Sequence, residues 1–196
     1  QHTRDRILQA DEVIKSPGIP DHVPLIKELV GKGIPVIAEI EYAARYHQSK
    51  VMGITGSNGK TTTTRLAFHL LQTAGFDVEM GGNVGKSFAR CLTEAHRAYY
   101  VLELSSFQLD GIVDFRPDIG MILNISPDHL DRYDYKMENY IRSKFRISMN
   151  QRPEDVFLYQ AENEHIAAFL REHDIRAEAL PMLRAALTEN GFMAGG

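Results

Sequence analysis

The sequence predicts an α/β fold built on a parallel β-sheet. Three observations predict this class: short β-rich runs alternate with helical runs, a Gly-rich turn joins one strand to the next helix, and polar residues follow two later strands. The 196 residues are 43% hydrophobic and 24% charged, which is an ordinary globular composition. This composition excludes a disordered tail and a collagen-like fibre.

The first quarter of the chain predicts two short strands, each followed by a helix. Asp21 is the predicted N-cap of the first helix, and Gly33 stands near its end. A domain boundary is expected near residue 48. The predicted elements before it are strand 11–15, turn 16–20, helix 21–32, strand 34–37 and helix 39–47.

The rest of the chain continues the alternation, with apolar strands and longer amphipathic helices. The predicted elements are strand 50–55, helix 60–74, strand 77–80, the turn 81–85 that opens a further helix, strands 98–103 and 118–125, helix 135–150, strand 155–159 and helix 163–173. Residues 176–196 carry no clear pattern.

The net charge and the lengths of the apolar runs limit the kinds of partner that the sequence predicts. Lys and Arg number 22 against 26 Asp and Glu, so a net charge of −4 gives no reason to expect a nucleic-acid partner. No apolar run reaches the roughly 18 residues of a bilayer span, so we expect no membrane insertion. Cys91 is the single cysteine, which excludes an intrachain disulfide and fits a reducing compartment.

The run Gly-Ile-Thr-Gly-Ser-Asn-Gly-Lys-Thr-Thr at residues 53–62 predicts a phosphate loop. It lies between a predicted strand and a predicted helix, which is the context that such a loop requires. Glycines let several N–H groups face one anion, and the helix N-terminus adds its positive end. ATP or GTP binding is therefore predicted, although the G-x-x-G-x-x-G-K-T spacing departs from the common form. The residues expected to hold the nucleotide are Gly56, Ser57, Asn58, Gly59, Lys60, Thr61 and Thr62.

An acid and a histidine follow two later strands, where ligands gather in parallel sheets. Glu103 ends the strand 98–103, and with Thr61 it could supply hard oxygen ligands for Mg²⁺. His129 comes shortly after the strand 118–125 and is expected at the same edge. A solvated acid and a structural histidine are the alternatives to these functional roles.

Lys144 stands near the centre of the apolar face of the helix 135–150, at about 100° per residue. Burial of an unpaired lysine is costly and lowers its pKa. One interpretation is snorkelling, with the stem packed and the ammonium in water. The other is a lysine placed inside a functional site and chemically modified.

Together these motifs resemble the Mur ligases over about residues 10–160. The resemblance rests on five runs: residues 15–19, 53–62, 81–85, 103–109 and 124–133. The Glu-Leu-Ser-Ser-Phe-Gln-Leu run at 103–109 favours the branch that adds D-glutamate over the sister ligases and the related folylpolyglutamate synthetases.

The resemblance implies a cytoplasmic step of peptidoglycan synthesis. ATP would phosphorylate UDP-N-acetylmuramoyl-L-alanine, and the amine of D-glutamate would then attack the acyl phosphate. It implies catalytic roles for Lys60, Glu103, His129 and Lys144, and two Mg²⁺ sites, one at Thr61 and Glu103 and one at His129 and a carbamylated Lys144. The residues implied to contact the muramoyl-alanine part of the substrate are Asn83, Ser105, Ser106 and Gln108, and Ser16, Pro17 and Gly18 are implied to form a wall of its UDP site.

The resemblance also implies a domain organisation. Residues 1–48 would be the C-terminal part of a Rossmann-like UDP-binding domain, and residues 49–196 an incomplete central domain of the P-loop ATPase type. The C-terminal ligase domain would be absent, so we expect a fragment that does not ligate alone, and a monomer is favoured. The alternatives are another P-loop enzyme, such as a small-molecule kinase or a GTPase, and a non-catalytic nucleotide-binding module; neither alternative predicts a buried lysine beside metal ligands.

Overall fold

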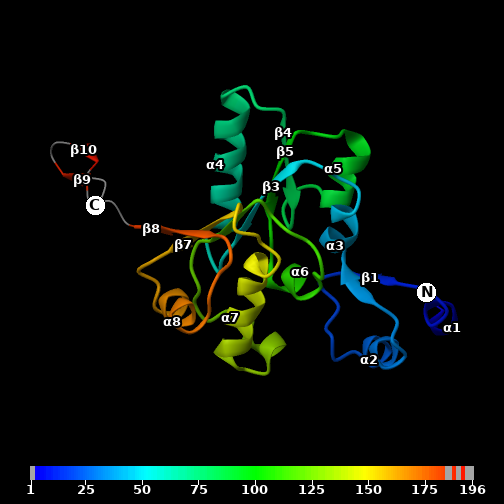
Figure 1. Cartoon of the computed structure of the whole chain (residues 1–196). Coiled ribbons are helices and arrows are strands. Elements are labelled where there is room, and N and C mark those ends of the chain that lie inside the picture. Colours follow the sequence, from blue (N-terminus) through cyan, green and yellow to red (C-terminus); the bar gives the residue numbers. More distant parts are fainter. Residues whose placement is uncertain (1–2, 184–186, 189–190, 193–196) are drawn as a thin grey trace.

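A computed structural model describes residues 3–183, 187–188 and 191–192, and it has the α/β fold that the sequence predicts (Figure 1). The strands are β1 (Val13–Lys15), β2 (Val36–Ala38), β3 (Lys50–Thr55), β4 (Val78–Gly82), β5 (Tyr99–Glu103), β6 (Ile119–Ile122), β7 (Val156–Gln160), β8 (Glu178–Met182), β9 (Leu187–Thr188) and β10 (Gly191–Phe192). The helices are α1 (Arg4–Ile7), α2 (Pro24–Gly31), α3 (Glu39–Ala44), α4 (Lys60–Thr73), α5 (Phe88–Glu94), α6 (Ser106–Asp110), α7 (Met137–Phe145) and α8 (Glu164–Glu172), with 3₁₀ turns η1 (Leu130–Tyr133) and η2 (Arg146–Ser148).

Six parallel strands form the central sheet in the order β4-β5-β3-β6-β7-β8. The chain enters the sheet at β3, runs to one edge, and later continues on the other side of β3. The strand order therefore reverses beside β3, and its neighbours there are β5 and β6. Ligands of open α/β sheets bind outside the carboxyl ends of the strands at such a switch point. The predicted phosphate loop follows β3 at this position.

The two faces of the sheet are covered by different helices (Figure 1). The larger core packs one face against side chains from α5, α6, α7 and α8, including Phe88, Leu109, Tyr140 and Ile166. On the other face, α4 packs over Ile54, Val78 and Val101. Because apolar surface is buried on both faces, the sheet is a rigid support for the loops at its carboxyl edge.

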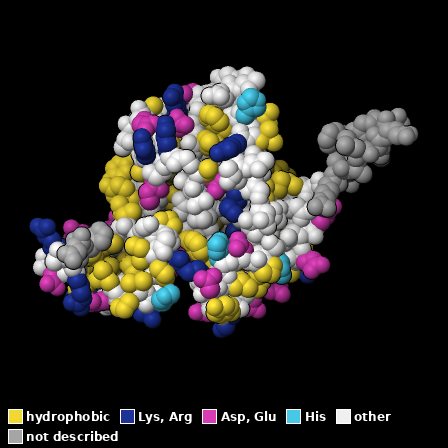
Figure 2. All heavy atoms as spheres, turned by 180° about the vertical axis from the view of Figure 1, so that it is seen from behind, with side chains coloured by type: hydrophobic (Ala, Val, Ile, Leu, Met, Phe, Trp, Pro, Cys, Tyr) yellow, Lys and Arg dark blue, Asp and Glu magenta, His cyan; other side chains and the backbone are white. Residues whose placement is uncertain are grey.

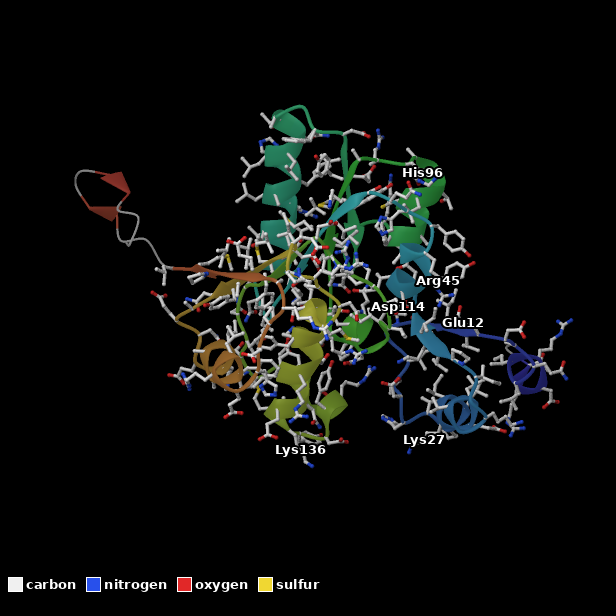
Figure 3. The ribbon with its side chains drawn as sticks, in the orientation of Figure 1. Glu12, Lys27, Arg45, His96, Asp114 and Lys136 are labelled. Atoms are coloured by element: carbon white, nitrogen blue, oxygen red, sulfur yellow. The ribbon has the colours of Figure 1, made fainter. Side chains whose placement is uncertain are left out.

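The N-terminal segment is joined to this sheet domain by specific contacts. β1 and β2 form a separate two-stranded parallel sheet, and α3 then packs into the larger core. The buried carboxylate of Glu41 accepts hydrogen bonds from the backbone N–H groups of residues 113–115, at 2.8–3.0 Å. Within the N-terminal segment itself, Arg45 and Glu12, both labelled in Figure 3, form a bidentate pair at 2.7 and 2.8 Å. The domain boundary near residue 48 stays a prediction.

Several predicted helices have different bounds in the structure, and the helix predicted for residues 39–47 ends at Ala44. Asp21 is not an N-cap, because α2 begins at Pro24, whose missing N–H suits a first helical turn. Asp21 instead accepts a hydrogen bond from Lys15 Nζ at 2.5 Å. The predicted helix 135–150 is shorter: α7 begins at Met137, because Tyr135 has φ +56°, and its last turn continues as η2.

Other differences concern short or weakly patterned segments. The strand predicted for residues 118–125 is confined to β6, and the first two glycines of the turn 81–85 belong to β4. Helices α1 and α6 and strand β8 were not predicted; four of the five β8 side chains are exposed, so no apolar alternation marks that strand. Residues 184–186, 189–190 and 193–196 of the unpatterned end lie outside the described residues. Within the described part of the chain, the helices are all too short or too polar to cross a membrane.

Candidate active site

The predicted phosphate loop connects β3 to α4 and holds its lysine inward. Gly59 lies immediately before α4 with φ +82°, a left-handed conformation that favours glycine. Lys60 Nζ donates to the carbonyl oxygens of Gly56 at 2.8 Å and Ser57 at 2.9 Å. The ammonium therefore lies over the loop, where a phosphate would meet it.

Contacts from the segment after β6 fix the shape of the loop. The backbone N–H of Ser57 donates to Asn124 O, and that of Asn58 donates to Asn124 Oδ1, both at 2.9 Å. Ser57 Oγ donates to Ser126 O at 2.9 Å and lies 3.1 Å from the Tyr140 hydroxyl. These atoms of Ser57 and Asn58 hold the loop together. The backbone N–H groups in the first turn of α4 have no carbonyl acceptor within the helix, so they are free to bind an anion.

Glu103 connects the phosphate loop to β4. It is only 2% exposed, and its Oε2 accepts from Thr61 Oγ1 at 2.6 Å. Its Oε1 accepts from Asn83 Nδ2 at 2.8 Å, so the structure brings Asn83 to the carboxylate. This approach requires Gly82, since a Cβ there would lie 2.2 Å from Glu103 O and the residue has φ +98°. The sequence predicted Glu103 beside Thr61 but not its bond to Asn83.

Lys144 of α7 is buried and does not snorkel, because its side chain is 1% exposed. Its Nζ donates to Gly56 O at 2.9 Å and lies 4.6 Å from the centre of the Tyr140 ring. Lys60 therefore shares its acceptor Gly56 O with Lys144. Burial, with the nearby Lys60 ammonium, lowers the Lys144 pKa to about 7. A large fraction of this amine is neutral near pH 7.

His129 lies in the loop after β6 with a positive φ of 49°. Non-glycine residues in this conformation are uncommon and cluster at functional sites. Its side chain is exposed, and the ring centre lies 5.4 Å from that of Phe107. Among the described residues, no three His, Cys, Asp or Glu side chains form a ready-made metal cluster. The predicted ligand pairs differ from such a cluster, because they include a threonine hydroxyl and a lysine.

The predicted substrate residues of the 103–109 run shape the start of α6. Ser105 and Gln108 form a capping box: the Gln108 N–H donates to Ser105 Oγ, and the Ser105 N–H donates to Gln108 Oε1. Ser106 is buried, and its carbonyl oxygen accepts from Ser143 Oγ at 3.0 Å. These contacts orient the loop after β5, and the predicted substrate contacts stay predictions.

The loop of Ser16, Pro17 and Gly18, here named the 16–18 loop, is hydrogen-bonded to the sheet domain by Arg132. The sequence did not single out this arginine as a site residue. Arg132 Nη2 donates to Pro17 O at 3.3 Å, and its Nη1 donates to Gly18 O at 3.4 Å. Arg132 stands three residues after His129 in a run already assigned to the site. Its place in that run was the one feature of the sequence that pointed to Arg132.

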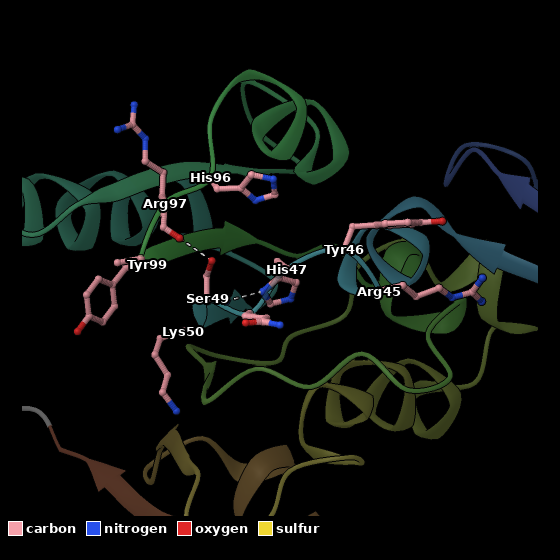
Figure 4. Close-up of a pocket in the computed structure, with 10 residues that line it drawn as sticks. Arg45, Tyr46, His47, Ser49, Lys50, His96, Arg97 and Tyr99 are labelled. Atoms are coloured by element: carbon pink, nitrogen blue, oxygen red, sulfur yellow. Dashed lines mark hydrogen bonds between the residues drawn. The ribbon is translucent and has the colours of Figure 1, made fainter.

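A second pocket lies away from the phosphate loop, at the amino-terminal ends of β3 and β5 (Figure 4). It has a volume of about 760 Å³ and is lined by several basic residues. Acids neutralise these cations: Lys50 pairs with Asp118 at 2.6 Å, and Arg97 pairs with Asp77 at 3.0 Å. Burial lowers the pKa of His47 there, which favours its neutral form. This pocket has no contact with the phosphate loop, and the loop edge is the better candidate site.

Comparison with known proteins agrees with this geometry. A family model described as the Mur ligase middle domain matches residues 54–183. A Christiangramia forsetii protein named UDP-N-acetylmuramoylalanine--D-glutamate ligase is 52% identical over 97% of this chain and 43% of its own length. A Bacteroides fragilis protein of the same name is also 52% identical, over 99% of this chain and 43% of its own length. The chain spans less than half the length of these curated relatives.

Solved structures show the same fold at lower identity. The Neisseria meningitides ligase named UDP-N-acetylmuramate:L-alanyl-gamma-D-glutamyl-meso-diaminopimelate ligase has a TM-score of 0.62 and 15% identity, over 93% of this chain and 63% of that one. A MurF ligase from Thermotoga maritima in complex with ADP has a TM-score of 0.57 and 18% identity, over 88% of this chain and 47% of that one. With the family model matching about two thirds of its residues, the chain belongs to the Mur ligase family and contains its middle domain.

Proposed function

We propose that this chain is the nucleotide-binding part of an ATP-dependent amide ligase that joins D-glutamate to UDP-N-acetylmuramoyl-L-alanine. One arrangement carries the proposal: the Thr61–Glu103 pair and the two lysines Lys60 and Lys144 converge on one phosphate loop. The curated relatives that match nearly the whole chain bear the name of that ligase, which supports the choice of substrates.

ATP would lie with its phosphates at the start of α4. The N–H groups of residues 59–62 face this position, and the helix dipole favours an anion there. The Lys60 ammonium exchanges the carbonyl oxygens of Gly56 and Ser57 for the β- and γ-phosphate oxygens. Asn58 and Ser57 support the nucleotide indirectly, because Asn124 holds their amides.

The residues present fit Mg²⁺ at this loop. Thr61 Oγ1 and Glu103 Oε2 are hard oxygen atoms 2.6 Å apart, beside the expected phosphates. Mg²⁺, when bound, neutralises phosphate charge and so favours transfer of the γ-phosphoryl group. His129 and a carboxylated Lys144 are the proposed ligands of a second Mg²⁺.

A low pKa and burial suit Lys144 to carbamylation. The neutral amine nitrogen bonds to the carbon of CO₂ and releases one proton, which leaves an anionic carbamate. The product places oxygen ligands where the ammonium stood and replaces repulsion from Lys60 with attraction. This step explains why a lysine occupies a buried position that an apolar residue would fill at lower cost.

The proposed reaction has two steps. A carboxylate oxygen of UDP-N-acetylmuramoyl-L-alanine attacks the γ-phosphorus of ATP, and ADP leaves. The amine of D-glutamate then attacks the acyl carbon, loses a proton and expels phosphate, which forms the amide. Asn83, Ser105, Ser106 and Gln108 are the proposed contacts of the muramoyl-alanine part of this uridine nucleotide substrate, and the 16–18 loop is the proposed wall of its UDP site. Consumption of ATP, together with the buried Cys91 thiol, supports a cytoplasmic location.

Nucleotide binding tests the first part of this proposal on the chain itself. Titration of ADP with Mg²⁺, followed by calorimetry, is expected to show binding that Lys60→Met weakens at least about tenfold. Lys136→Met is the matched control, because Lys136 is an exposed lysine just before α7. Equal affinity of all three proteins would reject the nucleotide site.

Turnover tests the second part and requires a protein of the relatives' full length that contains this sequence. ATP hydrolysis is expected to need both the muramoyl-alanine substrate and D-glutamate. Lys144→Ala is expected to abolish it, and added acetate is expected to restore part of it by supplying a carboxylate. Hydrolysis that ignores both substrates and Lys144 would leave a general nucleotidase and reject the ligase.

A further inference from the structure

Arg132 lies at the cleft between the N-terminal segment and the sheet domain. Seen from behind, the molecule has a notch between the lobe that carries the N-terminus and the rest (Figure 2). A cavity of about 360 Å³ is lined by Pro20, Asp21 and His22 from one side, and by Phe107, Asp110 and Arg132 from the other. Arg132 spans this boundary, because its guanidinium donates to Pro17 O and Gly18 O.

The same guanidinium is stacked on the sheet domain. Its carbon lies 4.3 Å from the centre of the Phe107 ring, within the range of a cation–π contact. The Phe107 ring in turn lies 5.4 Å from the His129 ring and is stacked with the Tyr133 ring at 6.0 Å. Tyr133 is held by hydrogen bonds from its hydroxyl to Asp110 at 2.9 Å and with Ser143 at 3.1 Å.

We propose that Arg132 is a positioning residue, which sets the 16–18 loop at a fixed place relative to Phe107 and His129. The inference rests on the proposed function, in which that loop contacts the uridine nucleotide substrate and His129 lies at the metal site. Arginine suits this role because its planar fork can donate to two carbonyls while its flat face stacks on a ring. Lysine offers a single ammonium and cannot make both contacts at once.

Hydrogen exchange on this chain tests the positioning directly. The N–H of Ile19 donates to Ser16 O inside the 16–18 turn, and it reports opening of that loop. Arg132→Lys and Arg132→Met are expected to speed exchange at Ile19 about tenfold, while amides of β3 keep their rates. Arg171→Met, an exposed arginine of α8, is the control and is expected to change neither. Unchanged exchange at Ile19, or equal acceleration at β3, would overturn the proposal.

Kinetics separate positioning from general stability. In a protein of the relatives' full length, Arg132→Lys is expected to raise the KM for the uridine nucleotide substrate about tenfold, with the KM for ATP unchanged. An unchanged KM for that substrate in an active variant would reject the positioning role of Arg132 and leave the proposed function intact. A wild-type protein without substrate-dependent turnover would reject the proposed function, and the exchange experiment would still decide whether Arg132 holds the loop.

Discussion

Replacing Lys144 with methionine changes how stability depends on pH, and the structure gives the size of the change. Methionine keeps most of the side-chain volume and removes the titrating amine. The side chain of Lys144 is 1% exposed, and its pKa is lowered from 10.5 to about 7 by burial and by the Lys60 ammonium. In the unfolded chain, the lysine keeps its ordinary pKa.

The sign follows from proton linkage. Between pH 7 and pH 10.5, the unfolded state holds a proton that the folded state has released, so the free energy of unfolding rises with pH. The slope approaches about 1.4 kcal/mol per pH unit, and half of it is present at the folded pKa. From pH 7 to pH 9, Lys144 alone therefore contributes a rise of about 2 kcal/mol. The contribution becomes flat about one pH unit below the folded pKa, where the amine is protonated in both states.

Urea unfolding of this chain in CO₂-free buffer at pH 7, 8 and 9 measures the effect. Over this range, the wild type is expected to gain about 2 kcal/mol relative to Lys144→Met. Lys136→Met should follow the wild type, since Lys136 is exposed and lies just before α7 (Figure 3). Parallel pH profiles for the wild type and Lys144→Met would refute the reasoning. Added bicarbonate at pH 8.5 should stabilise the wild type and not Lys144→Met, because only the amine forms a carbamate.

Two further substitutions test how the carboxyl edge is built, both by urea unfolding. Gly82→Ala is expected to lower stability by at least about 3 kcal/mol and to weaken ADP binding, because the new Cβ would lie 2.2 Å from Glu103 O. Gly85→Ala is the control: Gly85 also has a positive φ, of 71°, but an added Cβ would meet no described atom within 4 Å. Its expected loss of stability is about 1 kcal/mol. A loss as large as that of Gly82→Ala would contradict the explanation. Glu41→Gln is expected to cost about 2 kcal/mol, because residues 113–115 lose a charged acceptor; a neutral result would show that the anchor contributes nothing.

The sequence predicted the parts of the site that follow from local rules. A Gly-Lys-Thr turn between an apolar strand and a helix has few structural alternatives, and β3 and α4 begin where the sequence predicts. Glu103 was placed at a strand end, and parallel strands bring their carboxyl ends to one edge. Its 2.6 Å hydrogen bond with Thr61 confirms that this rule located a neighbour 42 residues away.

The parts that could not be predicted depend on contacts between distant segments. Helical periodicity placed Lys144 on the apolar face, but its acceptor Gly56 O lies 88 residues away in sequence. The contacts of Arg132 with the 16–18 loop join residues that are 114 and 115 positions apart in the sequence. β8 forms because β7 offers a free edge, and its own exposed side chains carry no strand signal.

The position of the two lysines is itself an argument for function. Lys60 and Lys144 donate to the same buried carbonyl oxygen, that of Gly56, so two lysine side chains meet at one acceptor. Repulsion and desolvation make this arrangement unfavourable, and a fold selected for stability alone would place an apolar residue at 144. Phosphate oxygens would draw Lys60 away from Gly56, and a carbamate would turn Lys144 into its electrostatic partner. The local conflict is therefore resolved by the same two ligands that the proposed reaction requires.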